Sequence, residues 1–104
     1  MTANEFRRMA LRLPDAIEAA HMGHPDFRVS GKIFATLGYP RQGMGVVILT
    51  REQQELFVRT EPTTFVPVPG GWGKKGSTHV MLRAATKAAV REALTMAWRN
   101  RADQ

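Results

Sequence analysis

Residues 27–37 read FRVSGKIFATL, in which two runs rich in apolar and β-branched residues are joined by Ser30-Gly31. A two-residue connection with glycine between two such runs predicts a β-hairpin. Because successive side chains of a strand point to opposite faces, alternation places Phe27 with Val29 on one face. The same rule groups three side chains of the second strand on one face: Ile33, Ala35 and Leu37.

The residues before this hairpin predict a helix followed by an extended segment. Thr2 and Glu5 have the spacing of a capping box, so a helix begins after Thr2 and runs to the Leu13-Pro14 break. Residues 17–22 predict an extended segment. The glycine and proline within residues 23–26 predict a turn just before the hairpin.

After the hairpin, a glycine-containing loop leads to a short, fully apolar strand, Val46–Leu49. Thr50 and Gln53 repeat the capping-box spacing, which predicts a second helix. We expect this helix to carry Leu56 and Phe57 toward the core and to end at the proline that follows it.

The remaining third of the chain predicts two strands and a long helix. Residues 65–68 form the first strand, and we place it at an edge of the sheet because Pro67 cannot donate a ladder hydrogen bond. A glycine-rich connection, residues 70–76, leads to the last strand, residues 78–83. The final helix, residues 85–101, buries a stripe of four side chains: Val90, Leu94, Ala97 and Trp98.

These elements predict a single α+β domain over residues 1–104. Hairpin-length connections favour a mainly antiparallel sheet, and the helices should cover one face of it, which gives two layers. The expected order is helix, strands, helix, two strands, helix. A chain of 104 residues can bury about 65% of its unfolded surface, which is enough for one core.

Composition narrows the environment of the chain. The longest unbroken apolar run is Val46–Leu49, whereas a membrane span needs ~20 residues, so we expect no membrane segment. Residues 1–13 have neither the apolar region nor the cleavage site of a secretory leader, so we expect a cytoplasmic protein. The chain has no cysteine, which agrees with that compartment and excludes disulfides, thiolate-bound zinc and cysteine nucleophiles.

Positive charge is concentrated in the last third of the chain. Of the net charge of +6, residues 72–104 carry +5 and residues 1–71 carry +1. Clustered basic residues and a pI near 10.8 are typical of proteins with a phosphate-rich partner, although solubility alone also favours a basic surface. Candidate binding residues are therefore sought in the last third.

Four runs of the sequence carry a family resemblance: GHPDFRVSGKIFA at residues 23–35, WGKKGST at 72–78, VML at 80–82 and ALTMAWR at 93–99. With them, the chain resembles the MmcQ/YjbR-like proteins over nearly its whole length. The resemblance implies a compact α+β domain whose fold is compared with type III secretion chaperones and with double-wing DNA-binding modules. Members are commonly labelled DNA-binding proteins, so the resemblance implies nucleic acid, and DNA in particular, as the partner. It supplies no catalytic residues.

The glycine-rich connection is the candidate binding loop. Residues 71–76 match the dinucleotide pattern G-x-G-x-x-G, but that motif needs a helix N-terminus after the glycines, and a strand is predicted there. They also resemble a broken P-loop, with Ser77 in place of the required lysine, so no nucleotide cofactor is expected. We expect a flexible loop in which Lys74 and Lys75 approach a phosphate backbone. A mobile surface loop without a ligand is the alternative.

The last helix supplies further candidate contacts. At 100° per residue with Lys87 at zero, Trp98 falls near 20°, Arg91 near 40° and Arg99 near 120°, so basic residues flank an indole at the rim of the buried stripe. Basic residues beside an indole are common on surfaces that bind nucleic acid without sequence preference. A tryptophan at such a rim also packs in cores, so a core and a surface position of Trp98 are both open. Thr78 could add a hydroxyl contact next to the loop.

No group of residues predicts a metal site or a catalytic site. His21, His24 and Asp26 are possible metal ligands by type, but their spacing is unsuitable and no second cluster completes a site. The chain also lacks a nucleophile elbow and paired carboxylates. We expect Arg28 to pair with Asp26, and His79 to be packed in the sheet or to lie at its edge.

The sequence therefore predicts a non-catalytic domain, without a cofactor, that binds nucleic acid through its phosphates. The candidate contacts are Lys74, Lys75, Thr78, Arg91 and Arg99. The alternative is a protein-interaction or chaperone-like module that uses an exposed sheet face or edge to dimerise or to hold a partner segment. Apolar binding of that kind would depend little on salt, whereas phosphate binding would weaken steeply as salt is raised.

Overall fold

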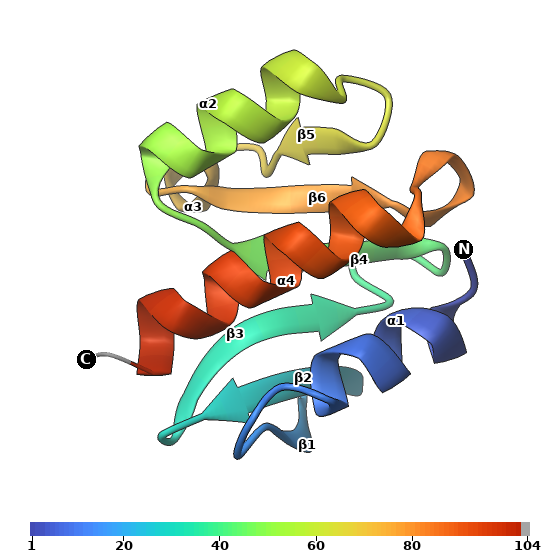
Figure 1. Cartoon of the computed structure of the whole chain (residues 1–104), viewed down its shortest axis with the longest axis vertical. Helices are drawn as coiled ribbons and strands as arrows, with labels where there is room; N and C mark the ends of the chain where they lie inside the picture. Colours follow the sequence, from blue (N-terminus) through green and yellow to red (C-terminus); the bar gives the residue numbers. More distant parts are fainter. Residues whose placement is uncertain (103–104) are drawn as a thin grey trace.

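The computed structural model describes residues 1–102, which form one antiparallel sheet with helices packed on one of its faces (Figure 1). The strand order is β1-β2-β3-β4-β6-β5. This confirms the predicted two-layer α+β architecture. The elements, in chain order, are α1 (Ala3–Leu11), β1 (Ile17–His21), β2 (His24–Val29), β3 (Lys32–Leu37), β4 (Met44–Ile48), α2 (Arg51–Thr60), β5 (Phe65–Pro67), α3 (Gly71–Lys74), β6 (Ser77–Met81), a 3₁₀ turn (Leu82–Ala84) and α4 (Lys87–Ala102).

Both predicted capping boxes are present at helix N-termini. The Thr2 hydroxyl accepts a hydrogen bond from the Glu5 N–H at 3.1 Å, and the Glu5 carboxylate accepts one from the Thr2 N–H at 2.9 Å. Thr50 and Gln53 repeat this exchange at the start of α2. The Thr2 backbone N–H and then Lys87, whose Nζ lies 3.0 Å from Glu5, lower the pKa of Glu5 to about 2. The first turn of α1 is thereby tied to α4.

The first hairpin turn lies earlier than predicted. The prediction of a turn over residues 23–26 is wrong, because the turn is Met22-Gly23 and His24 already pairs with His21 across β1 and β2. Both turn residues have positive φ, 50° at Met22 and 81° at Gly23, which is the backbone twist that a two-residue hairpin requires. A methionine in that conformation gives no sequence signal for the turn.

The second hairpin, which joins β2 to β3 through Ser30-Gly31, is confirmed but contains a bulge. Phe27 pairs with Ala35 and Arg28 pairs with Ile33, so Phe34 is an extra residue in β3. Simple alternation therefore fails at this point: Phe34 is fully buried, and Ile33 is only half-buried.

One hydrophobic core lies between the sheet and the helices. Phe57 of α2 packs on Phe65 of β5 with ring centroids 4.9 Å apart, and Phe6 of α1 packs near Phe27 of β2. The expectation that Leu56 also enters the core is wrong, because it is 42% exposed while the next residue, Phe57, takes the inward position. Within residues 1–102, no helix has both the length and the apolar character needed to cross a membrane.

The long helix α4 lies across the sheet and against α1 (Figure 1). Val90, Leu94 and Ala97 are buried, as the stripe predicts. Trp98 is half-buried, packs against the core, and donates from its indole Nε1 to the Pro14 carbonyl at 2.9 Å. This resolves the position of Trp98: it joins α4 to the segment that follows α1 and is not an open stacking surface.

Candidate nucleic-acid interface

The candidate loop contains a one-turn helix, α3, and the backbone at Gly73 and at Gly76, which follows α3, is packed too closely to allow a side chain. A Cβ at Gly73 would lie 1.6 Å from the Val68 carbonyl oxygen, and a Cβ at Gly76 would lie 2.0 Å from that of Leu49. Gly76 also has a φ of 117°, which favours glycine. The prediction of a flexible loop is therefore wrong, because the glycines serve close approach of the backbone here.

Helix α2 holds the same segment from the inside through Gln54. This side chain is buried, and its Nε2 donates to the Gly73 carbonyl at 2.9 Å and to the Ser77 carbonyl at 3.0 Å. Both donors of the amide are then satisfied, and losing either would leave a buried polar group without a partner. The backbone between α3 and β6 is thus fixed before any ligand arrives.

The side chains that this backbone presents to solvent are Trp72, Lys74 and Lys75, which we call the α3 surface. Trp72 is 73% exposed, and both lysines are exposed. The Lys75 Nζ lies 6.0 Å from the centre of the Trp72 ring, within cation–π range. Among residues 1–102, no carboxylate forms an ion pair with either lysine. An indole beside two unpaired ammonium groups can stack on a base and contact phosphates.

Thr78 does not belong to the α3 surface. It is fully buried, and its hydroxyl donates to the Gly76 carbonyl at 2.8 Å. Its neighbours across the sheet are Val47 on β4 and Pro67 on β5. The prediction that Thr78 contacts a phosphate is therefore wrong, because β6 is an interior strand and this position faces the core.

The two candidate arginines lie on a different part of the molecule. Arg91 lines a groove of about 180 Å³ between α1 and α4, together with Arg12. Arg99 is exposed and lies about 80° further around α4. In Figure 1, α1 and α3 lie on opposite sides of α4. The structure thus keeps Lys74 beside Lys75 but separates Arg91 from them.

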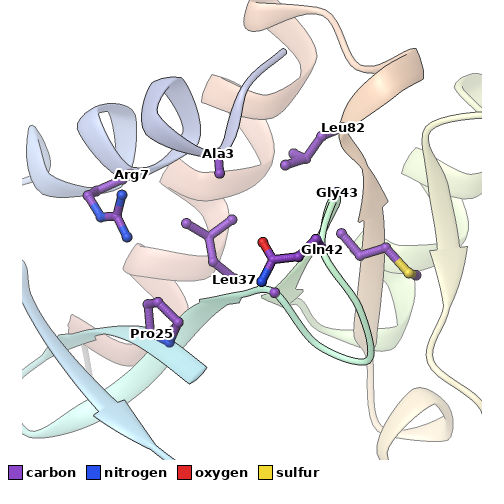
Figure 2. A pocket seen from close by; sticks show the side chains of 9 residues that line it. Ala3, Arg7, Pro25, Leu37, Gln42, Gly43 and Leu82 are labelled. Atoms are coloured by element: carbon purple, nitrogen blue, oxygen red, sulfur yellow. The ribbon is translucent and has the colours of Figure 1, made fainter. Parts of the chain in front are cut away.

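A pocket of about 200 Å³ opens beside the N-terminal half of α1, and Figure 2 shows its lining. Arg7 and Gln42 bring polar groups to its wall. Arg7 is already engaged, since its Nε donates to Glu18 at 2.9 Å and its Nη1 donates to Asn4 at 2.7 Å. Ligand pockets usually begin at about 300 Å³, so the exposed α3 surface is the stronger candidate site.

Asp26, His21 and His24, the possible metal ligands by type, make structural contacts in and around the β1–β2 hairpin. Asp26 is fully buried and accepts hydrogen bonds from Arg28 at 2.7 and 3.0 Å, which confirms the predicted pair. His21 Nδ1 lies 2.8 Å from the same carboxylate. His24 instead packs edge-on against Tyr39. The expectation that the chain binds no metal stays a prediction.

His79, by contrast, is packed in the interior of the sheet. It is 6% exposed, and β6 has neighbours on both sides. Burial lowers its pKa, against a smaller opposite effect of the Gly45 backbone. The ring is therefore neutral at physiological pH and gives the interface no charge.

Together, the sheet, its helix layer and the α3 surface define a small α+β domain that exposes an aromatic and basic surface. The sequence model of the YjbR family matches residues 11–100. The chain therefore belongs to the YjbR family, which confirms the resemblance seen in the sequence. No curated protein matches the chain, and no solved structure does.

Two residues of this site are missing from the sequence-based candidates. The sequence offers a sign that Trp72 is exposed, because it stands between Gly71 and Gly73, outside any apolar stripe, where no predicted element could bury it. The sequence offers no sign of the role of Gln54, because that role depends on carbonyl groups 19 and 23 residues away.

Proposed function

We propose that this YjbR-family chain is a non-catalytic domain that binds nucleic acid through phosphate contacts. The observation that carries the proposal is the pair Lys74 and Lys75, exposed on a fixed backbone and without an ion pair among residues 1–102. The +5 charge of residues 72–104 adds long-range attraction for a polyanion. DNA is the expected partner, and the cysteine-free sequence suits a cytoplasmic domain.

Rigidity of the backbone supports a binding role for these two lysines. Gly73, Gly76 and Gln54 already hold the segment in place. Binding then has to order only the lysine side chains, which lowers the entropic cost of association. Because the contacts are to phosphates, we expect little preference among base sequences.

The test is fluorescence anisotropy of a labelled DNA duplex of about 12 base pairs, titrated at several salt concentrations. Each phosphate contact contributes about −0.9 to the slope of log K against log salt. Lys74→Ala/Lys75→Ala should therefore flatten the slope by about 1.8. A thermal melt of the variant should match that of the wild type, because both side chains are exposed.

The matched control is Arg41→Ala/Arg83→Ala, which removes the same charge from the other end of β6. Both arginines are exposed, and neither forms an ion pair within residues 1–102. This variant should keep the wild-type slope to within a few tenths. An equal loss in both variants would mean that net charge, and not the α3 surface, holds the duplex. Undetectable binding of the wild type at ~50 mM salt to both this duplex and a single strand of the same length would reject the proposal.

A protein-interaction module is the second candidate, and the free edge of β1 favours it. Within residues 1–102 this strand pairs only with β2, and its Ile17 is 58% exposed. Met22, in the adjoining turn, is 92% exposed. An added strand could use the open backbone groups of this edge and cover the apolar side chains. Its binding would be nearly independent of salt, in contrast to binding at the α3 surface.

A further inference from the structure

We propose that Trp72 stacks on an unpaired base, so that the preferred ligand of this chain is single-stranded rather than duplex nucleic acid. The proposal builds on the nucleic-acid binding proposed above and assigns Trp72 the selection between strand states. The indole is 73% exposed, whereas tryptophan is highly buried on average in folded proteins. An exposed indole forgoes the free energy of burial, so a role in binding accounts for its position better than a role in folding.

The two glycines before Trp72 leave room for a ligand beside the backbone. A Cβ built at Gly70 or at Gly71 would meet no atom within 4 Å. Gly70 and Gly71 therefore carry no side chain and have open space at their Cβ positions. On this side, the backbone of a nucleic acid could run close to the protein without steric obstruction.

Lys75 occupies one side of the indole, which sets the geometry of the complex. Its Nζ lies 6.0 Å from the ring centre, so a base would stack on the other face. The ammonium groups of Lys74 and Lys75 would then be available for the phosphates that flank the stacked base. Aromatic stacking combined with backbone cations is the usual way to bind single strands without sequence preference.

Duplex DNA cannot use the same contact without being opened. Its bases are already stacked and paired, and moving one onto Trp72 requires that it leave the helix. A duplex is therefore limited to the two lysine contacts. A single strand can use the lysines and the indole together, and we expect it to bind more tightly at equal salt.

The probes are a labelled 12-nucleotide oligothymidylate and a duplex of the same length, both titrated by fluorescence anisotropy. The wild type should bind the single strand at least about 5-fold more tightly, the effect of one stacked base. Trp72→Ala should weaken single-strand binding by roughly 5- to 150-fold and leave duplex binding unchanged. Trp72→Phe, which keeps an aromatic face, should retain most of the affinity. None of these variants should change the salt slope, because the indole carries no charge.

Thermal melts provide the control for folding, since replacing an exposed side chain should leave the melting temperature unchanged. Equal affinity of the wild type for both probes, or an unaltered single-strand affinity in Trp72→Ala, would overturn the stacking proposal. Either result, together with a flattened slope in Lys74→Ala/Lys75→Ala, would leave phosphate binding intact. If the wild type showed no salt-dependent binding to either probe, the proposed nucleic-acid-binding function itself would be rejected.

Discussion

At the scale of single residues, Asp26 is a buried carboxylate whose charge is balanced by its neighbours. Hydrogen bonds from Arg28 hold its pKa below the ordinary value of 3.8, although burial opposes this effect. The unfolded chain therefore binds this proton at higher pH than the folded chain does. The resulting stabilisation is complete well above pH 4 and is lost as the pH falls through the folded-state pKa.

We therefore expect Asp26→Asn to be less stable than the wild type at pH 7 and to lose less stability between pH 5 and about pH 2. Urea unfolding at a series of pH values measures both effects. Asp15→Asn is the control, because Asp15 is exposed and forms no ion pair within residues 1–102. If the unfolding free energies of Asp26→Asn and the wild type changed in parallel across this pH range, the pKa of Asp26 in the folded state would not be lowered.

The position of a side chain can be predicted from sequence when its hydrogen-bond partners are close in the chain. The capping boxes at Thr2 and Thr50 are exchanges over three residues, and both were predictable. The sequence does not determine the position of Trp98, because its partner, Pro14, lies 84 residues away. For Thr78 the prediction fails because closeness in sequence to the glycine-rich segment does not tell which face of the sheet a side chain occupies, and this one is buried.

At the scale of elements, α3 is a helix that its own residues do not favour. Gly71 and Gly73 have a poor helix propensity, so local pattern predicts a loop. The helix forms because the chain after β5 packs against Gly73 of α3 at Val68, while the chain after β4 packs at Leu49 against Gly76, which follows α3. Contacts of this kind depend on the finished sheet and cannot be read from the segment alone. The longer helices and most strands, by contrast, follow from periodicity and caps.

Gly73→Ala tests whether close packing holds α3. The added Cβ would collide with the Val68 carbonyl, so the backbone must shift and stability should fall by about 1–3 kcal/mol. Gly71→Ala is the matched control, because its Cβ meets nothing within 4 Å and alanine favours helix. Thermal or urea unfolding decides between them. Equal stability of the two variants would contradict the packing role of Gly73 and restore the flexible loop.

At the scale of the whole molecule, two basic surfaces lie apart on a domain of 30 × 28 × 27 Å. Figure 1 shows α3 on one side of α4 and α1 on the other side. Arg91 lines the groove between α1 and α4, and Arg99 is exposed on α4. Arg91 therefore does not form one compact site with Lys74 and Lys75. A nucleic acid that contacts both lysines and Arg91 has to pass across α4.

The length of the bound strand should therefore decide which cations it contacts. For a single strand of about 6 nucleotides held at the α3 surface, Lys74→Ala/Lys75→Ala should flatten the salt slope by about 1.4, and Arg91→Ala/Arg99→Ala should leave it unchanged. For a strand of about 24 nucleotides, which can cross α4, each double variant should flatten the slope by about 1.4. Anisotropy titrations with both lengths make this comparison.

An equal flattening of the salt slope by Arg91→Ala/Arg99→Ala on the short strand would place all four cations in one site. No flattening with either strand would leave Arg91 and Arg99 as ordinary solvated residues. The separation of α1 from α3 across α4 favours the length-dependent outcome, because a ligand too short to cross the helix has no route to both surfaces.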